Sequence, residues 1–272
     1  MVINDTYDFI KAKFNSHLEN IRIEKAVFGA HLSAVKLTDG SYGVAGTLSD
    51  NQYHCRKQDR DFGDFTPTKI TGQSVASLFE TDKSSGLIDT LRIAVLNAIS
   101  SAIIAKGNYK IIENTDPFDL LDLSQKKTIT IVGAFQSYIQ RISESNHQLI
   151  VLELNKDALS SEYQKYYVPA GDYTKVVPGS DVVIITGLTL VNGTIDGLLS
   201  AVSPDTKVIV TGPSGSIVPD ILFRNKVNII GATRISNPDL LFPVVCESGT
   251  GFHLFRYCAQ KICIVNEQQE RA

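Results

Sequence analysis

The feature that most constrains the fold is a regular alternation of two kinds of segment from residue 128 onward. Short β-branched runs alternate with amphipathic stretches, which is typical of parallel strands joined by helices. Most of the runs are uninterrupted apolar sequence, as in strands covered on both faces. We therefore expect an α/β fold, with a doubly wound, Rossmann-like, mostly parallel sheet in the C-terminal part. The predicted strands are 128–133, 149–154, 181–187, 207–212, 227–231 and 261–265, and the predicted helices are 135–142, 194–202, 217–225 and 238–246.

The first 110 residues predict a different architecture. Apolar residues spaced by three or four from Ile3 to Ile21 indicate a helix with one buried face and Asp5 as its N-cap. Extended runs at 23–28, 31–37 and 42–47, with a hairpin turn at Asp39-Gly40, predict an antiparallel meander. A polar loop, a short helix at 74–80 and a long apolar helix at 87–105 follow. This order predicts an α+β domain, and we place the boundary near 122, which gives domains 1–122 and 123–272. Residues 156–179 predict only a short helix and an irregular connection.

Charge and composition exclude several classes of function. The 26 Lys and Arg against 29 Asp and Glu give a net charge of −3, which provides no positive field for nucleic acid. The longest apolar stretch is broken by Asn97, Ser100 and Ser101, so no membrane span is expected. The first residues do not resemble a signal peptide, and the four cysteines are interpreted as reduced thiols. We expect a cytoplasmic protein that binds a small molecule, and the sequence is compatible with an oligomer.

Several motifs in the second half resemble one known family. The segments 185–194 (ITGLTLVNGT), 210–214 (VTGPS) and 230–232 (IGA) occur in the order and context of the DUF364 family, which is named for heavy-metal chelation. Residues 1–110, including LRIAVLNA at 91–98, resemble its usual N-terminal partner, the DUF4213 domain with an enolase-N-terminal-like fold. The resemblance implies the handling or synthesis of metal-chelating small molecules in a cleft between the two domains. It implies no role for any single residue.

The turns that follow the predicted strands contain the candidate ligand-binding residues, because ligands of doubly wound sheets bind outside the carboxyl ends of the strands. The turn after the third strand offers hydroxyls, an amide and the first N–H groups of a helix, and the turn after the fourth directs its amides and a helix dipole at one point. Both patterns favour an anion. Helix capping by Asn192 and Thr194, or a purely structural turn, are the alternatives. The candidates are Thr186, Gly187, Thr189, Asn192, Gly193, Thr194, Gly212, Pro213 and Ser214.

A second candidate site follows the first strand. Gly133 matches the first glycine of a dinucleotide fingerprint, but Phe135 stands where a second glycine lets the pyrophosphate approach, which disfavours NAD in its usual mode. Glu153 lies twenty residues after Gly133, the separation at which an acid binds a ribose hydroxyl. An adenosine-containing cofactor at Gly133, Phe135 and Glu153, either S-adenosylmethionine or NAD, stays open beside the alternative of a tight turn and a solvated acid.

Metal ligands are not apparent in the spacing of the cysteines and histidines. Cys246, His253, Cys258 and Cys263 match no common zinc pattern, and we interpret the cysteines as small buried hydrophobes, with Cys258 and Cys263 on opposite faces of one strand. A transition metal is therefore expected only through a chelating ligand.

Five further residues are candidates for the cleft, each with a structural alternative. His54 lies in a polar loop that is either a lid or a solvated loop, and His31 is either an interface group or a core histidine. Asn97 is either a cleft residue or a buried amide bonded to backbone. Gly249 and Gly251 form either a cleft wall or a helix end with Gly249 at C′.

The sequence contains no recognisable catalytic motif. The expected function is binding of a small anionic, metal-chelating molecule in the interdomain cleft, in heavy-metal chelation or in the synthesis of chelators. The alternatives are a transferase-type enzyme that uses an adenosine-containing cofactor, and an interaction protein with a vestigial cleft.

Overall fold

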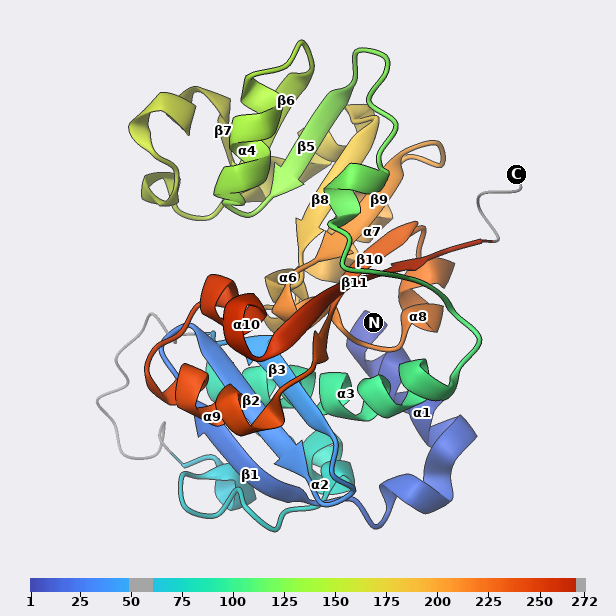
Figure 1. Cartoon of the computed structure of the whole chain (residues 1–272), viewed down its shortest axis with the longest axis vertical. Coiled ribbons are helices and arrows are strands. Elements are labelled where there is room, and N and C mark those ends of the chain that lie inside the picture. Colours follow the sequence, from blue (N-terminus) through green and yellow to red (C-terminus); the bar gives the residue numbers. More distant parts are fainter. Residues whose placement is uncertain (49–60, 268–272) are drawn as a thin grey trace.

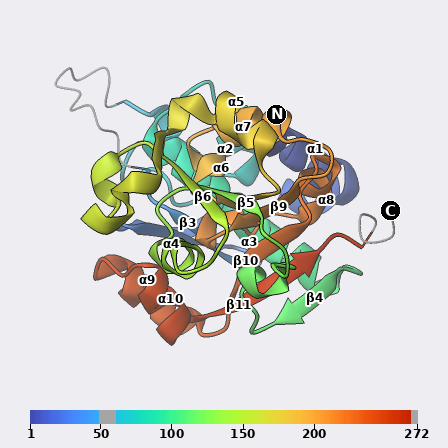
Figure 2. The same cartoon turned by 90° about the horizontal axis from the view of Figure 1, so that it is seen from above.

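The computed structural model describes residues 1–48 and 61–267, and its C-terminal unit is built on one sheet of eight strands. Six strands run parallel in the order β7-β6-β5-β8-β9-β10 (Figure 1), and two antiparallel strands, β11 and β4, complete one edge (Figure 2). This arrangement confirms the predicted fold class. The strands are β4 (Lys110–Glu113), β5 (Thr128–Val132), β6 (Gln148–Glu153), β7 (Tyr167–Pro169), β8 (Val182–Thr186), β9 (Lys207–Thr211), β10 (Ile229–Ile235) and β11 (Ala259–Val265).

Short helices cover both faces of this sheet. Figure 2 shows α4 (Gln136–Ser143) and α10 (Gly251–Tyr257) on one face, and α5 (Tyr173–Val176) and α7 (Ile195–Ala201) on the opposite face. Because helices of this length are unstable alone, docking through buried side chains stabilises them. In α4 these are Tyr138, Ile139 and Ile142. The remaining helices of this unit are α6 (Leu188–Val191), α8 (Pro219–Arg224) and α9 (Pro238–Cys246).

The N-terminal unit is the predicted α+β arrangement. The antiparallel meander consists of β1 (Ile23–Phe28), β2 (Leu32–Leu37) and β3 (Tyr42–Gly46), and Gly40, with φ +85°, forms the hairpin turn as expected. The helices are α1 (Val2–Leu18), α2 (Val75–Glu80) and α3 (Gly86–Lys106). A Cβ at Gly43 would lie 2.0 Å from the Ala94 carbonyl oxygen, so this glycine lets α3 contact β3 closely. Although α3 is apolar and long enough to cross a bilayer, 67% of its apolar window is buried, as in the central helix of a folded core.

Two elements cross between the units. β4 joins the large sheet, and α9 packs on β1 and β2 with Leu241 and Val245 in one core with Leu32 and Ala34. A helix from the C-terminal half thus completes the core of the N-terminal unit. The predicted boundary near 122 stays a prediction.

Some local expectations are wrong at the ends of elements. α1 begins at Val2, so Asp5 lies in its first turn and is not the N-cap; its Oδ2 lies 3.1 Å from the N-terminal ammonium. α8 begins at Pro219, two residues later than predicted, and β10 runs on to Ile235, where it pairs with β11. Residues 156–179 contain 3₁₀ turns together with β7 and α5.

The cysteine and cap predictions need three corrections. Cys246 is exposed, not buried. Cys258 ends α10 and precedes β11, so it does not share a strand with Cys263, although both are buried. Ser248, with φ +61°, takes the C′ position predicted for Gly249, whose amide closes the helix end on the Val244 carbonyl (2.8 Å).

Candidate functional site

The order of the parallel strands reverses between β5 and β8, at the place where doubly wound sheets bind ligands. The carboxyl ends of β5, β8 and β9 point towards the N-terminal unit in Figure 1. Three neighbouring cavities lie along this edge. We call them the strand-edge cavity, the interdomain cavity and the aromatic cavity.

The strand-edge cavity, of about 320 Å³, lies at the ends of β5, β6 and β8. It brings together parts of both predicted sites, which are far apart in the sequence, and residues of the segment 156–179 also line it. The structure places six candidate residues here, together with Ala170, Gly171 and Tyr173: Gly133, Glu153, Thr186, Thr189, Asn192 and Thr194.

Local hydrogen bonds hold most of these polar groups. Glu153 Oε1 accepts the amides of Leu154 (2.7 Å) and Asn155 (3.2 Å). The Thr189 hydroxyl donates to the Thr186 carbonyl (2.7 Å). Asn192 Oδ1 accepts the amide and hydroxyl of Thr194, and the side chain of neither residue caps α7. Thr194 thus takes the predicted N-cap position without the expected side-chain cap, and the pair stabilises the turn that precedes the helix.

The interdomain cavity, of about 300 Å³, is lined by both units. His31, Gly46 and Thr47 come from the N-terminal unit, and His31 is exposed, which overturns its interpretation as a core histidine. Gly46 donates its amide to Ser214 Oγ (2.8 Å), which ties β3 to the turn after β9. The lining residues from the C-terminal unit are Thr186, Leu188, Gly212, Pro213 and Ser214.

The turn after β9 does not lead directly into a helix. Gly212, with φ +111°, is followed by a 3₁₀ turn at Pro213–Gly215, and α8 starts only at Pro219. The amide of Val218, at the start of α8, is buried and donates to Ser100 Oγ of α3 (2.8 Å). We predicted that the dipole of a helix would point at this turn, and this is wrong. α8 starts later in the chain, and a side chain of α3 accepts the amide at its first turn.

Asn97 of α3 also hydrogen-bonds to the turn after β9. Its Nδ2 donates to the carbonyls of Val44 (2.7 Å), Pro213 (3.2 Å) and Ser214 (3.2 Å), and the residue is 3% exposed. Asn97 is thus the buried amide of the alternative interpretation, and it positions a wall of the interdomain cavity from outside. Its Oδ1 is buried without a hydrogen-bond partner.

The aromatic cavity, of about 570 Å³, lies on the face of the sheet that carries α4 and α10. Phe135 lines this cavity and not the one that contains Gly133 and Glu153, so the predicted cofactor set divides between two cavities. Gly212 and Pro213 line both this and the interdomain cavity, and Gly251 lies at its rim.

A polar cluster of Asp116, Tyr138 and Lys261 lines the aromatic cavity, and Tyr138 is its one buried member. Asp116 accepts hydrogen bonds from the Tyr138 hydroxyl, from Lys261 Nζ (2.8 Å) and from the Phe118 amide (3.1 Å). Burial acts to raise the pKa of Asp116, but these three donors outweigh it and hold the pKa below its ordinary value. Burial and the neighbouring carboxylate raise the pKa of Tyr138, so its hydroxyl stays a donor.

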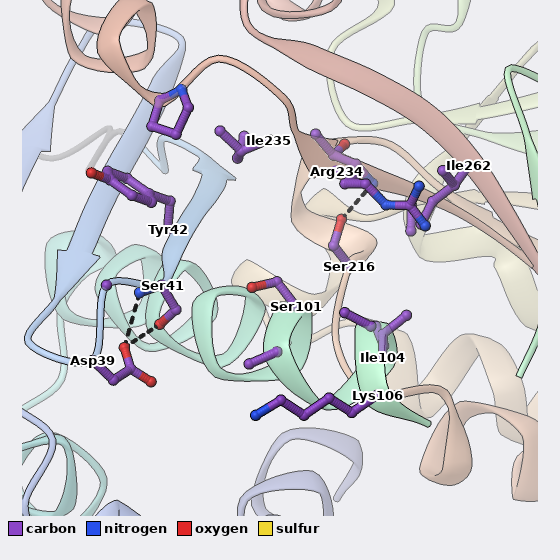
Figure 3. Close-up of a pocket in the computed structure, with 16 residues that line it drawn as sticks. Asp39, Ser41, Tyr42, Ser101, Ile104, Lys106, Ser216, Arg234, Ile235 and Ile262 are labelled. Carbon is purple, nitrogen blue, oxygen red and sulfur yellow. Dashed lines mark hydrogen bonds between the residues drawn. The ribbon is translucent and has the colours of Figure 1, made fainter. Parts of the chain in front are cut away.

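A fourth cavity, of about 480 Å³, lies between the β2–β3 hairpin, the end of α3 and β10, and none of the predicted site residues lines it (Figure 3). Lys106 and Ser101 of α3 lie across from Arg234 of β10 in this view, with Asp39 at one end. Arg234 is paired with Glu113 (2.6 Å), and Asp39 Oδ1 accepts the amide and hydroxyl of Ser41.

Several candidates lie outside these cavities. Gly187, Gly193 and Gly249 line none of the four; Gly187 packs so tightly that a Cβ would lie 2.6 Å from the Gly215 amide. His54 falls outside the described residues. Within residues 1–48 and 61–267, no group of three or more His, Cys, Asp or Glu is arranged to hold a metal ion.

The sequence did not predict Asp116, Tyr138 and Lys261 as residues of a site. They come from three segments that are far apart in the sequence, and none of them is part of a recognisable motif. The one available signal was the Asn114–Pro117 stretch, whose turn residues lie directly against the end of the sheet.

Family models match most of the chain. The DUF364 model, described as "putative heavy-metal chelation", matches residues 116–264, and the DUF4213 model, with the same description, matches residues 11–100. No curated protein matches the chain at a significant level.

Two solved structures share the whole fold. A DUF364-family protein of unknown function from Pyrococcus horikoshii superposes with a TM-score of 0.78 at 21% identity, covering 98% of this chain and 100% of its own. A second one, from Desulfitobacterium hafniense DCB-2, has a TM-score of 0.72 at 16% identity, covering 97% and 100%. The chain therefore belongs to the DUF364 family, with a DUF4213 domain as its N-terminal unit.

Proposed function

We propose that this protein binds a small anionic metal chelate in the interdomain cavity. The observation that carries the proposal is the composition of this cavity: both units supply its walls, and among the lining residues that the structure describes His31 is the one titratable group. Within residues 1–48 and 61–267, no carboxylate lines it, so a bound anion meets no like charge from these residues. The family description, heavy-metal chelation, supports the same chemistry.

In this proposal the ligand, not the chain, supplies most of the metal's coordination. The described residues contain no metal-binding cluster, whereas one imidazole can occupy a single open position on a chelated metal. Thr186 Oγ1 accepts the Leu188 amide (3.3 Å), which leaves its hydrogen to donate to an oxygen of the chelator.

Ni²⁺–nitrilotriacetate tests the proposal, because it is a small anionic chelate with open coordination positions. Titration of tag-free protein by calorimetry should show binding of this chelate and weaker binding of bare Ni²⁺. His31→Gln should reduce chelate affinity at least about tenfold, the scale of a lost metal-supporting interaction. A native mass spectrum of freshly purified protein, compared with its denatured mass, should identify any chelate retained from the cell.

His253→Gln is the matched control. His253 accepts the Thr250 amide through Nδ1 in a capping box, and glutamine serves equally well at that helix position, so the fold is preserved. Chelate affinity should not change. Binding of bare Ni²⁺ as tight as that of the chelate would place the metal site in the chain itself and contradict the proposal.

A second candidate function, a transferase-type enzyme with an adenosine-containing cofactor, is favoured by the strand-edge cavity. Gly133, with φ +103°, turns tightly at the end of β5, and Glu153 ends the neighbouring strand β6, as a nucleoside site requires. The cavity walls include Leu154 and Tyr173, which suit an adenine ring.

A variant in which a larger side chain fills the strand-edge cavity tests this second function. A Cβ at Gly171 would meet no atom within 4 Å, and its φ is not left-handed, so Gly171→Leu should extend into the cavity mouth without strain. If the cavity binds a nucleoside, S-adenosylmethionine, S-adenosylhomocysteine or NAD should bind the wild type, and the variant should lose that binding. Absence of binding of all three to the wild type at millimolar concentration would remove this candidate.

We expect both functions to operate in the cytoplasm, where the cysteines remain reduced. Cys246, Cys258 and Cys263 are free thiols, which is consistent with such a compartment.

A further inference from the structure

Aromatic side chains from two helices line the aromatic cavity. Phe135 stacks on Tyr138 at the start of α4, with ring centroids 5.4 Å apart. Phe252 and Phe255 of α10 line the same cavity. α4 and α10 are distant in the sequence but lie on the same side of the sheet (Figure 2), and residues of both line this cavity. Aromatic side chains from two helices favour a flat, apolar ligand that stacks against them.

Phe252 is 73% exposed, which is unusual for a phenylalanine at the rim of a cavity. Its neighbour Gly251 leaves open space, since an added Cβ would meet no atom within 4 Å. The cavity volume, about 570 Å³, is in the range of small-molecule sites. The site is therefore large enough for a ligand that would cover the exposed ring.

The charges at this cavity favour an anion. The negative charge of Asp116 is compensated by its ion pair with Lys261 Nζ (2.8 Å), and this ammonium has two further hydrogens to donate. Lys261 also lies over the Phe255 ring, 5.5 Å from its centroid. Arg256 is exposed at the rim, and no acidic partner for it is found in the part of the chain that the structure describes.

We propose that the aromatic cavity is a second binding site, which takes a planar aromatic acid. The ring lies between the aromatic side chains of α4 and α10, and the carboxylate pairs with Lys261 and Arg256. This site lies on the α4 and α10 face of the sheet, apart from the strand-edge cavity, and does not depend on the metal chelate proposed above.

Anthranilate is a suitable probe. The chain contains no tryptophan, so the fluorescence of bound anthranilate can be read without interference. We expect saturable binding of anthranilate and of salicylate, and weaker binding of salicylamide, which has the same ring without the negative charge.

Variants in α10 locate the site. Phe252→Ala should weaken anthranilate binding about two- to tenfold, as expected for a lost aromatic contact, and Tyr257→Ala, which removes another exposed ring of the same helix (53% exposed) outside the cavity, should not. Arg256→Gln should reduce the preference for salicylate over salicylamide. Since these side chains are exposed, the urea midpoint should remain close to that of the wild type.

Two plugged variants separate this site from the strand-edge cavity. Gly251→Leu fills the rim of the aromatic cavity and should abolish anthranilate binding, whereas Gly171→Leu should leave it intact. No binding of anthranilate or salicylate to the wild type at millimolar concentration overturns the proposal. Equal effects of Phe252→Ala and Tyr257→Ala, or unchanged binding in Gly251→Leu, overturn it as well.

Discussion

At the residue scale, Asn97 connects the two units by satisfying three carbonyls with one amide nitrogen. Asn97→Ala removes this donor, after which the Pro213 carbonyl keeps only the longer hydrogen bond from the Ser216 hydroxyl (3.3 Å), and the loss should cost about 2 kcal/mol of unfolding free energy. Asn97→Asp should cost more, because oxygen replaces the donor. Urea unfolding measures both, and Asn108→Ala, at an exposed position, is the control and should stay within about 0.5 kcal/mol. An equally small effect of Asn97→Ala would contradict this role.

Asp116 gives the stability a defined pH dependence. Its pKa is depressed in the folded state despite burial, because Lys261, Tyr138 and the Phe118 amide hydrogen-bond the charged form. A depressed folded-state pKa contributes stability above the unfolded-state pKa, near 3.9, and that stability is lost as the pH falls through the folded-state pKa.

We expect Asp116→Asn to be less stable than wild type at neutral pH and to lose less further stability below about pH 4, because asparagine does not ionise. Urea midpoints at neutral pH and along an acid series measure the difference, with Asp205→Asn, at an exposed site, as the control. Parallel curves for wild type and Asp116→Asn would show that the cluster does not stabilise the fold.

At the scale of elements, α3 organises the interface through two adjacent serines in different environments. Ser100 is fully buried and accepts the Val218 amide at the start of α8, whereas Ser101 is exposed and donates to the Ala98 carbonyl. Ser100→Ala should therefore destabilise the protein by about 1–2 kcal/mol, and Ser101→Ala by less than about 0.5 kcal/mol. Thermal or urea unfolding compares them directly, and equal effects would refute the assigned contact.

Elements with strong periodicity were predictable, and their partners were not. The strands at 128–133 and 207–212 are short β-branched runs that end at a glycine, so the sequence predicts them almost to the residue. β4 was missed because its four residues are half-exposed and pair only with a strand nearly 150 residues away. α10 was missed because one buried residue, Leu254, anchors it, which leaves no helical pattern.

The candidate site was predictable in position but not in composition. The rule that ligands bind at the carboxyl ends of strands places Gly133, Glu153 and Thr186 at one edge, and the structure brings them into one cavity. Gly133 and Phe135 line different cavities because the chain turns tightly between them, where the Phe135 amide donates to the Gly133 carbonyl. The local sequence does not show the direction that the chain takes after this turn.

At the scale of the whole molecule, hydrogen bonds connect the two units at several points, so we do not expect either unit to be stable without the other. The amide of Val2 donates to Asp196 Oδ1 (2.8 Å), and the Tyr109 hydroxyl donates to Asp220 Oδ2 (2.7 Å), at separate points of the interface. Together with the contacts of Asn97 and Ser100, these bonds fix the interdomain cavity. A chelate should therefore bind to a preformed cavity and stabilise both units together.

Substitutions in α9 test whether the two units unfold together, because this helix belongs to the C-terminal unit and packs on the N-terminal meander. Leu241 is fully buried there, so Leu241→Ala should cost about 2–5 kcal/mol, whereas Leu240→Ala, 41% exposed, should cost little. If the chain unfolds as one unit, Leu241→Ala accelerates hydrogen exchange equally in β1–β3 and in the central strands β5, β8 and β9. Acceleration confined to β1–β3 would show instead that the N-terminal unit opens alone, and the interdomain cavity would then be a mobile cleft.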